Sequence, residues 1–239
     1  MANKARRLEN AMSRIRNVAL ALAGAVFATS AASAGSPVAL IEELSGNPAG
    51  LEVMEYLETG RIVRLSARQT IVLSYLNSCT RETITGGTVT VGTEQSEVLS
   101  GKVERTKVRC DRGKASLSGE LAIQIAGRAF RGVPLVNEAV TASQVNQPTI
   151  YGLSPMLEVR SPGVLLIERI DQAAHAYALY VEQNQLVRGY YDFARWGKTL
   201  VAGGTYRVVA GADEIVFKVD SEAKAGSIPI VSRLVRLPN

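Results

Sequence analysis

His175 is the only histidine among the 239 residues of the chain, and this limits the acid–base chemistry that the chain could perform. Histidine is the residue whose ordinary pKa suits proton transfer near neutral pH, so a Ser-His-Asp triad would have to use this side chain. Ser161 and Asp171 are nearby in the sequence, but no Gly-x-Ser-x-Gly motif presents a serine as a nucleophile. We therefore expect His175 to be a partly exposed residue at the start of a strand.

Two pairs of adjacent acids are the candidates for carbohydrate chemistry. They are Glu42 with Glu43 and Asp213 with Glu214. A glycosidase places two carboxyl groups on either side of the bond that it cleaves. Adjacent residues of a strand point to opposite faces, so neither pair would converge on one substrate. We predict that these four side chains are surface charges.

One aromatic cluster and two glycine pairs complete the candidate binding features. The cluster consists of Tyr190, Tyr191, Phe193 and Trp196. It is either a binding patch or part of a core, and the large area that Tyr and Trp bury favours the core. Gly86-Gly87 and Gly203-Gly204 do not stand in a strand-to-helix phosphate motif. No residue pattern in the chain indicates a cofactor.

Cys79 and Cys110 are the two cysteines of the chain. An even number of cysteines in an exported protein predicts a disulfide. Its loop of about 32 residues would contribute up to about 3.7 kcal/mol by the chain-entropy relation. Two isolated cysteines and one distant histidine do not form a zinc site, and no Cys-x-x-Cys redox motif is present.

The first 34 residues have the three parts of a secretory signal peptide, which are a basic start, an apolar run and small residues before the cut. The start carries one acid, Glu9, against five basic residues: Lys4, Arg6, Arg7, Arg14 and Arg16. An apolar run at 18–28 precedes Ala32-Ser33-Ala34, so we predict cleavage between Ala34 and Gly35. The alternative is an uncleaved anchor, although 18–34 is shorter than the roughly 20 apolar residues that span a membrane.

The charge of the chain is concentrated in this predicted signal peptide. The formal net charge is +5, from 27 basic and 22 acidic residues. Removing five basic residues and one acid leaves 22 basic and 21 acidic residues, a net charge of +1. A nucleic-acid-binding protein needs a concentrated basic face. We therefore expect no nucleic-acid partner, and we interpret the basic stretch at 102–109 as the solvated face of a strand.

The mature chain has the pattern of an all-β protein, with short strands separated by glycine-based turns. In its first half the predicted strands are 38–44, 61–65, 70–76, 81–85, 88–92 and 98–108. A turn is expected at 66–69, and Gly86-Gly87 predicts a hairpin or a tight bend. The disulfide would then join two strand ends. Residues 117–125 suit either a strand or a short helix.

The second half predicts an antiparallel sandwich, because strands recur about every ten residues. Its expected strands are 157–160, 164–170, 176–181, 186–191, 205–210 and 214–220. The polar segment 137–155 is the best linker, and we place a domain boundary near 148. The predicted domains are thus the signal peptide at 1–34, a disulfide-containing β domain at 35–148 and a β-sandwich at 149–239.

Two stretches resemble known extracytoplasmic modules. The strands from Gly60-Arg61-Ile62-Val63 to Val89-Thr90-Val91-Gly92 are similar to the short β repeats of FecR-type periplasmic domains. Leu200 to Val208, with Gly204-Thr205-Tyr206-Arg207-Val208, resembles a strand of immunoglobulin-like modules. The resemblance implies a FecR-like domain followed by an immunoglobulin-like domain. It transfers no functional residue to this chain.

These observations favour a non-enzymatic periplasmic protein that binds a partner protein or another component of the cell envelope. They also predict no membrane span in the mature chain. One alternative is an exported carbohydrate-active enzyme, which needs two carboxylates about 5–9.5 Å apart in one cleft. Another is a carrier of a small ligand, which needs an apolar cavity of several hundred Å³.

Overall fold

The computed structural model describes residues 36–112, 147–172, 176–226 and 228–237. The predicted signal peptide, the segment 117–125 and His175 lie outside the described residues. Residues Gly35–Asn239 cluster into one unit by their contacts, and the boundary near residue 148 stays a prediction. The described residues contain two 3-10 turns of three residues each and are otherwise strands and loops, which confirms the predicted all-β class.

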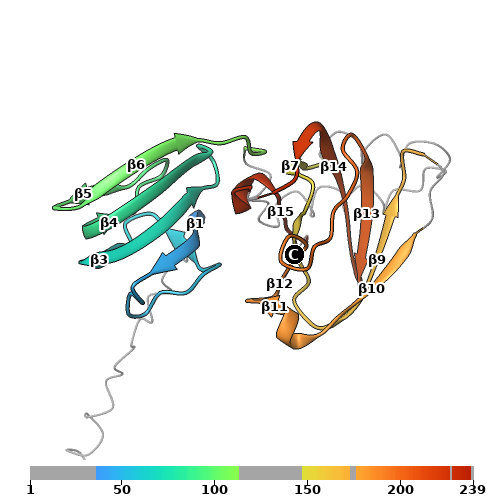
Figure 1. The fold of residues 1–239 in the computed structure, drawn as a ribbon, viewed down its shortest axis with the longest axis horizontal. Helices are drawn as coiled ribbons and strands as arrows, with labels where there is room; N and C mark the ends of the chain where they lie inside the picture. The colour runs from blue at the N-terminus through green and yellow to red at the C-terminus, as the bar shows by residue number, and fades with distance from the viewer. Residues whose placement is uncertain (1–35, 113–146, 173–175, 227, 238–239) are drawn as a thin grey trace, which may run out of the picture. The chain divides into compact units, whose positions relative to one another are not determined.

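The first sheet is formed by strands from the first half of the chain, which Figure 1 draws in blue to green. Its strands are β1 (Pro37–Ser45), β2 (Tyr56–Glu58), β3 (Ile62–Tyr75), β4 (Thr80–Thr90), β5 (Glu97–Leu99) and β6 (Lys102–Lys107). All its pairings are antiparallel, in the order β2-β1-β3-β4-β5, and β6 also pairs with β4. The alternating apolar residues of β3 and β4, such as Ile71, Leu73, Ile84 and Val89, form its buried core.

Strands β3 and β4 are longer than the sequence predicts, because each continues through a segment that we expected to turn. Leu65 pairs with Gly87 and Thr70 pairs with Thr85, so residues 66–69 bulge out of β3. Gly86 and Gly87 lie opposite this bulge at φ values of 66° and 84°. Of the two alternatives predicted at the glycine pair, the hairpin is wrong. The pair forms a bend, and this bend lies within one continuous strand, β4.

The remaining strands form two further sheets that enclose a common core. The larger has the order β10-β9-β13-β14-β7 and the smaller has the order β11-β12-β8-β15. Leu165 and Phe217 of the larger sheet pack with Leu157 and Tyr191 of the smaller one. The bounds are β7 (Thr149–Gly152), β8 (Met156–Glu158), β9 (Gly163–Arg169), β10 (Tyr177–Val181), β11 (Leu186–Val187), β12 (Tyr190–Asp192), β13 (Thr205–Ala210), β14 (Asp213–Lys224) and β15 (Leu234–Val235).

This arrangement confirms the predicted sandwich and adds two details. Most pairings are antiparallel, but β7 joins β14 and β15 joins β8 in parallel. The single strand expected at 186–191 is in fact two strands, because Arg188 and Gly189 have positive φ values of 49° and 81° and form a tight hairpin turn. The segment Gln183–Gln185, which precedes β11, forms a 3-10 turn.

A third apolar cluster links the first sheet to the smaller sheet of the sandwich. Leu40 and Leu76 of the first sheet region pack with Met156, Tyr190 and Leu234. The 3-10 turn Ile230–Ser232, labelled η2, contributes Val231 to the same cluster. Within the described ranges, no helix has the length and hydropathy that crossing a membrane requires.

Candidate functional site

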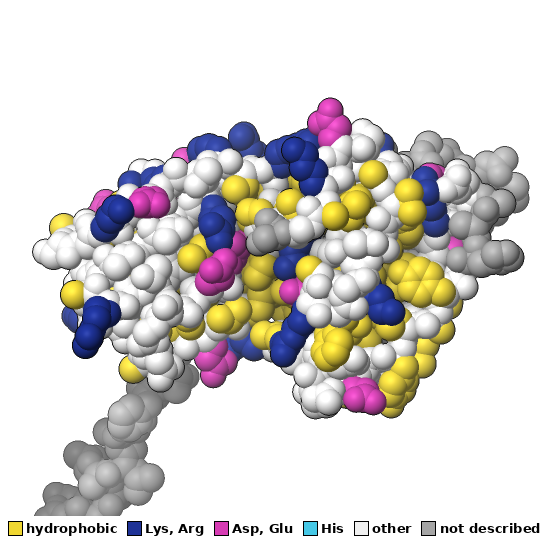
Figure 2. All heavy atoms as spheres, in the orientation of Figure 1, with side chains coloured by type: hydrophobic (Ala, Val, Ile, Leu, Met, Phe, Trp, Pro, Cys, Tyr) yellow, Lys and Arg dark blue, Asp and Glu magenta, His cyan; other side chains and the backbone are white. Residues whose placement is uncertain are grey.

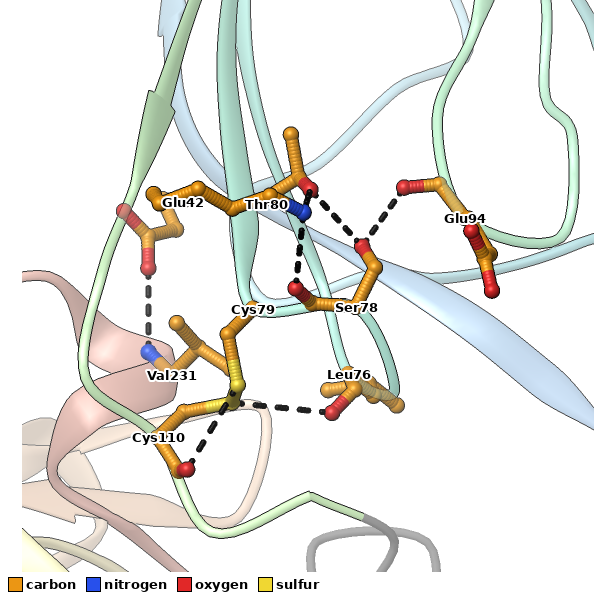
Figure 3. The surroundings of a disulfide bond; sticks show 9 residues. Glu42, Leu76, Ser78, Cys79, Thr80, Glu94, Cys110 and Val231 are labelled. Carbon is orange, nitrogen blue, oxygen red and sulfur yellow. Dashed lines mark hydrogen bonds between the residues drawn. A yellow bond between two sulfur atoms is a disulfide. The ribbon is translucent and has the colours of Figure 1, made fainter.

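The predicted disulfide between Cys79 and Cys110 is present and joins two strand ends. Cys79 directly precedes β4, and Cys110 follows β6, where Thr80 pairs with Lys107. The Lys107 ammonium donates to the Thr80 hydroxyl at 2.7 Å and to the carbonyl of Ser78 at 3.1 Å. In Figure 3 the disulfide faces the Leu76 carbonyl; this is a van der Waals contact, because a disulfide sulfur carries no proton to donate.

The disulfide also positions the segment that leaves β6 and reaches the larger sheet of the sandwich. Arg109 forms ion pairs with Asp220 at 3.1 Å and with Glu222 at 3.2 Å, both on β14. Its guanidinium carbon lies 4.4 Å from the centre of the Tyr151 ring on β7. The backbone N–H of Thr149 donates to the Asp111 carboxylate at 2.7 Å. Residues 109–111 therefore bridge from the disulfide to β7 and β14.

A groove of about 580 Å³ lies beside this bridge. Its lining is mostly apolar and includes Val108, Tyr151, Ile228 and Pro229. Its charged residues are Arg109, Glu222 and Lys224. Burial raises the pKa of the Tyr151 hydroxyl, so this side chain stays neutral and can only exchange hydrogen bonds. The volume is in the roughly 300–1,000 Å³ range of small-molecule sites.

A smaller pocket of about 300 Å³ contains the first of the two predicted acid pairs. Glu42 is 5% exposed, so the prediction that it is a surface charge is wrong. The register of β1 against β3 shifts between Ile41 and Glu43, which is a β-bulge. A bulge breaks the strict alternation of faces, and both carboxylates consequently reach Arg81, at 2.9 Å from Glu42 and 2.8 Å from Glu43.

This pocket does not have the arrangement of an acid–base pair. Glu42 also accepts a hydrogen bond from the backbone N–H of Val231 at 3.0 Å, which Figure 3 shows. Both carboxylates are thus engaged by a shared guanidinium, and one is engaged by the backbone as well. Of the second pair, Asp213 contacts Arg160 at 3.4 Å. Within the described ranges, no cluster of three or more metal-ligating side chains exists.

A buried arginine holds the segment that lines both pockets. The Arg233 guanidinium binds the Asp192 carboxylate at 2.6 and 3.2 Å. It also donates to the carbonyls of Ser154 at 3.1 Å and Ile228 at 3.2 Å. Ile228 and Pro229 contribute to both pockets, so this one side chain fixes a wall that the two sites share.

The aromatic cluster predicted from the sequence is divided between the core and the surface. Tyr190, Tyr191 and Phe193 are buried, whereas Trp196 is 40% exposed. Tyr191 and Phe193 pack edge to face at 5.5 Å. The Tyr190 hydroxyl lies 2.9 Å from the Tyr56 hydroxyl, and burial raises the pKa of both. These four side chains therefore do not form one exposed patch.

An apolar surface that we did not expect lies on β9 and β10. Tyr180 pairs with Val164, and Ala178 pairs with Leu166, so these four side chains share one face. Tyr180 is 66% exposed and Val164 is 55% exposed. Figure 2 shows hydrophobic side chains gathered where Figure 1 places these strands. The sequence does contain a signal for this surface. Every residue of 164–167 and 176–181 is apolar, so both faces of these strands are apolar, whereas a strand with one solvent-exposed face is normally apolar only at every second residue.

We call the set Val164, Leu166, Ala178 and Tyr180 the outer apolar face. Strand β10 is the end strand of its sheet, and β9 is the one described strand that pairs with it. The outer apolar face therefore adjoins an edge where backbone groups can accept a further strand.

Comparisons of the chain with protein-family models, with curated proteins and with solved structures find no match.

Proposed function

We propose that this chain is an exported, non-enzymatic protein that binds a partner protein in the periplasm, and that the partner contributes a strand to the edge of β10. The observation that carries the proposal is the outer apolar face beside this edge. Contiguous apolar side chains on a protein surface commonly mark an interaction site. An edge strand adds directional backbone hydrogen bonds, and alternating side-chain contacts add specificity.

Export is supported by two independent features. The first 34 residues have the composition of a signal peptide. The disulfide between Cys79 and Cys110 leaves no free cysteine, and such bonds persist in oxidising compartments such as the bacterial periplasm. The resemblance of the first half to FecR-type domains and of Leu200 to Val208 to immunoglobulin-like strands supports the same location.

The contacts of the acid pairs do not favour the carbohydrate-active alternative. A glycosidase needs one carboxyl group that donates a proton and a second that remains charged. Glu42 and Glu43 instead bind the same arginine. This ion-pair network positions strands, so we assign it a structural role.

The experiment places a photo-crosslinking amino acid at position 180 or 164 of the mature protein and exposes it to envelope extract from its own bacterium. A matched control carries the crosslinker at exposed Lys102 on β6, which is far along the chain and on another sheet. We expect one protein to crosslink at 180 and 164 but not at 102. Binding of that protein should slow amide exchange at Tyr177–Val181.

Two results would contradict the proposed mode of binding. One is crosslinking that is as strong at 102 as at 180, because the outer apolar face would then have no special role. The other is a partner whose binding leaves amide exchange in β10 unchanged, because strand addition requires hydrogen bonds to that backbone. A specific hydrolase or transferase activity in a substrate screen would contradict the non-enzymatic assignment.

A further inference from the structure

The groove beside the disulfide is separate from the surface proposed to bind a partner protein. It is lined by residues of β7 and β14, and these strands stand at the opposite end of the sheet from β10. A ligand in the groove would therefore not contact the outer apolar face. The two sites can be tested one at a time.

The groove has the composition of a site for a small organic molecule. Four of its residues, Val108, Tyr151, Ile228 and Pro229, present carbon surface. Small-molecule sites combine such a lining with a few polar groups that fix orientation. Here the polar groups are charged residues of β14 and of the bridge, together with Ser232.

The charged residues of the groove favour one sign of charge on the ligand. Arg109 and Lys224 contribute two positive charges and Glu222 contributes one negative charge. Arg109 is already compensated by Asp220 and Glu222. Lys224 makes no ion pair with any described residue. An anion can consequently pair with Lys224 without breaking an existing contact. A cation would be repelled by Lys224, and the acids that could attract it, Asp220 and Glu222, already bind Arg109.

The walls of the groove are held in place before any ligand binds. Cys110, next to Arg109, is fixed by the disulfide. On the other side, Arg233 binds the Ile228 carbonyl and the Asp192 carboxylate. Walls that are already ordered lose little conformational entropy on binding, which favours affinity.

We propose that this groove binds an amphipathic anion, a molecule with an apolar chain or ring and one carboxylate or similar group. The apolar body lies against Val108, Tyr151 and Ile228, and the anionic group pairs with Lys224. The proposal does not depend on the partner-binding function. A ten-carbon carboxylate, decanoate, is a suitable probe because its chain length suits a groove of about 580 Å³.

The experiment titrates the disulfide-bonded mature protein with decanoate, decanol and decylamine below their micelle concentrations. Calorimetry measures affinity, and amide chemical shifts locate the site. We expect decanoate to bind most tightly and decylamine least tightly, with shifts concentrated at Val108, Tyr151 and Ile228. Substitution of Lys224→Gln should weaken decanoate about three- to fivefold, the scale of an exposed ion pair, and leave decanol unchanged.

Two controls make the result decisive. Lys218→Gln removes an exposed lysine from the same strand but outside the groove, and it should leave decanoate binding unchanged. Val108→Asp places a charge on the apolar wall and should abolish binding of decanoate and decanol alike, with the fold checked by its unfolding transition. The proposal is overturned if decylamine binds as well as decanoate, if Lys224→Gln has no effect, or if the shifts map elsewhere.

Discussion

The Glu42 carboxylate and the backbone N–H of Val231 form a hydrogen bond of 3.0 Å across 189 positions of sequence. The other oxygen of the same carboxylate accepts from Arg81 at 2.9 Å. One buried side chain thus connects β1 with β4 and with η2. This contact exists because the β-bulge after Ile41 releases Glu42 from the regular alternation of the strand.

We expect Glu42→Gln to destabilise the protein by about 1–3 kcal/mol, since the amide keeps an acceptor for Val231 but loses the charge opposite Arg81. Glu43 binds the same arginine but its side chain is 67% exposed. Glu43→Gln should therefore change stability by no more than about 0.5 kcal/mol. Urea unfolding of both variants measures the difference. Equal losses would show that burial of Glu42 is unimportant.

Loss of the disulfide should lower stability by up to about 3.7 kcal/mol, because the unfolded chain regains the freedom of its loop. The test compares urea unfolding of the oxidised protein, the reduced protein and the double variant Cys79→Ser, Cys110→Ser. The reduced protein and the variant should unfold at the same lower urea concentration, and a reductant should not affect the variant. An unchanged midpoint on reduction would refute the expected contribution.

Local patterns predicted most strands, because the alternation of apolar residues is local information, and the disulfide followed from the presence of two cysteines in a chain with a predicted signal peptide. The alternating run Thr205–Ala210 has one apolar face, and this face became core, whereas the continuous run Ile71–Tyr75 is buried on both faces. The predictions failed where the structure depends on the register between neighbouring strands. The bulges at Glu42 and at 66–69 depend on which residues lie across from them, and no local pattern specifies that pairing.

The candidate sites were less predictable than the strands. Val108, Tyr151 and Ile228 are distant in sequence and meet only after three segments have packed. Nothing in the sequence distinguishes Lys224 from other surface lysines. Its role in the proposed site depends on Asp220 and Glu222, which pair with Arg109 and not with Lys224. The outer apolar face had a signal in the sequence, because consecutive residues of β9 and β10 are apolar. The sequence did not indicate that β10 would be an edge strand.

The Asp171 carboxylate should stay charged to unusually low pH. Arg169 donates to its two oxygens at 2.9 and 3.0 Å, and Thr205 donates its backbone N–H at 3.0 Å. These bonds, mainly those from Arg169, lower the pKa of Asp171 to about 2 from an ordinary 3.8. A lowered pKa stabilises the fold above the ordinary value, so this contribution is lost as pH falls from 3.8 through about 2.

Carboxyl-carbon NMR measures this titration directly. In Arg169→Gln the Asp171 pKa should rise toward its ordinary value, because the largest cause of the shift is removed. The Thr205 hydrogen bond remains in that variant, so a part of the shift should persist. An unchanged titration after Arg169→Gln would mean that the ion pair does not set the pKa.

Gly87 and Gly60 provide a matched test of why the chain needs glycine at the bend of β4. Their φ values are nearly equal, 84° and 85°. A Cβ at Gly60 would meet nothing within 4 Å, whereas one at Gly87 would lie 2.4 Å from the Leu99 carbonyl oxygen and 2.6 Å from the Gly101 nitrogen. Both substitutions to alanine strain the backbone, but only the second also forces the β5–β6 connection away from β4.

We expect Gly60→Ala to cost about 1–2 kcal/mol, the strain of a left-handed conformation. Gly87→Ala should cost roughly 3 kcal/mol or more, because backbone atoms must move in addition. Urea unfolding gives both values. Amide exchange should also become faster in β5 and β6 for Gly87→Ala and stay unchanged there for Gly60→Ala. If the two variants lose equal stability, conformational strain alone explains the glycine, and the close approach of the β5–β6 connection contributes nothing.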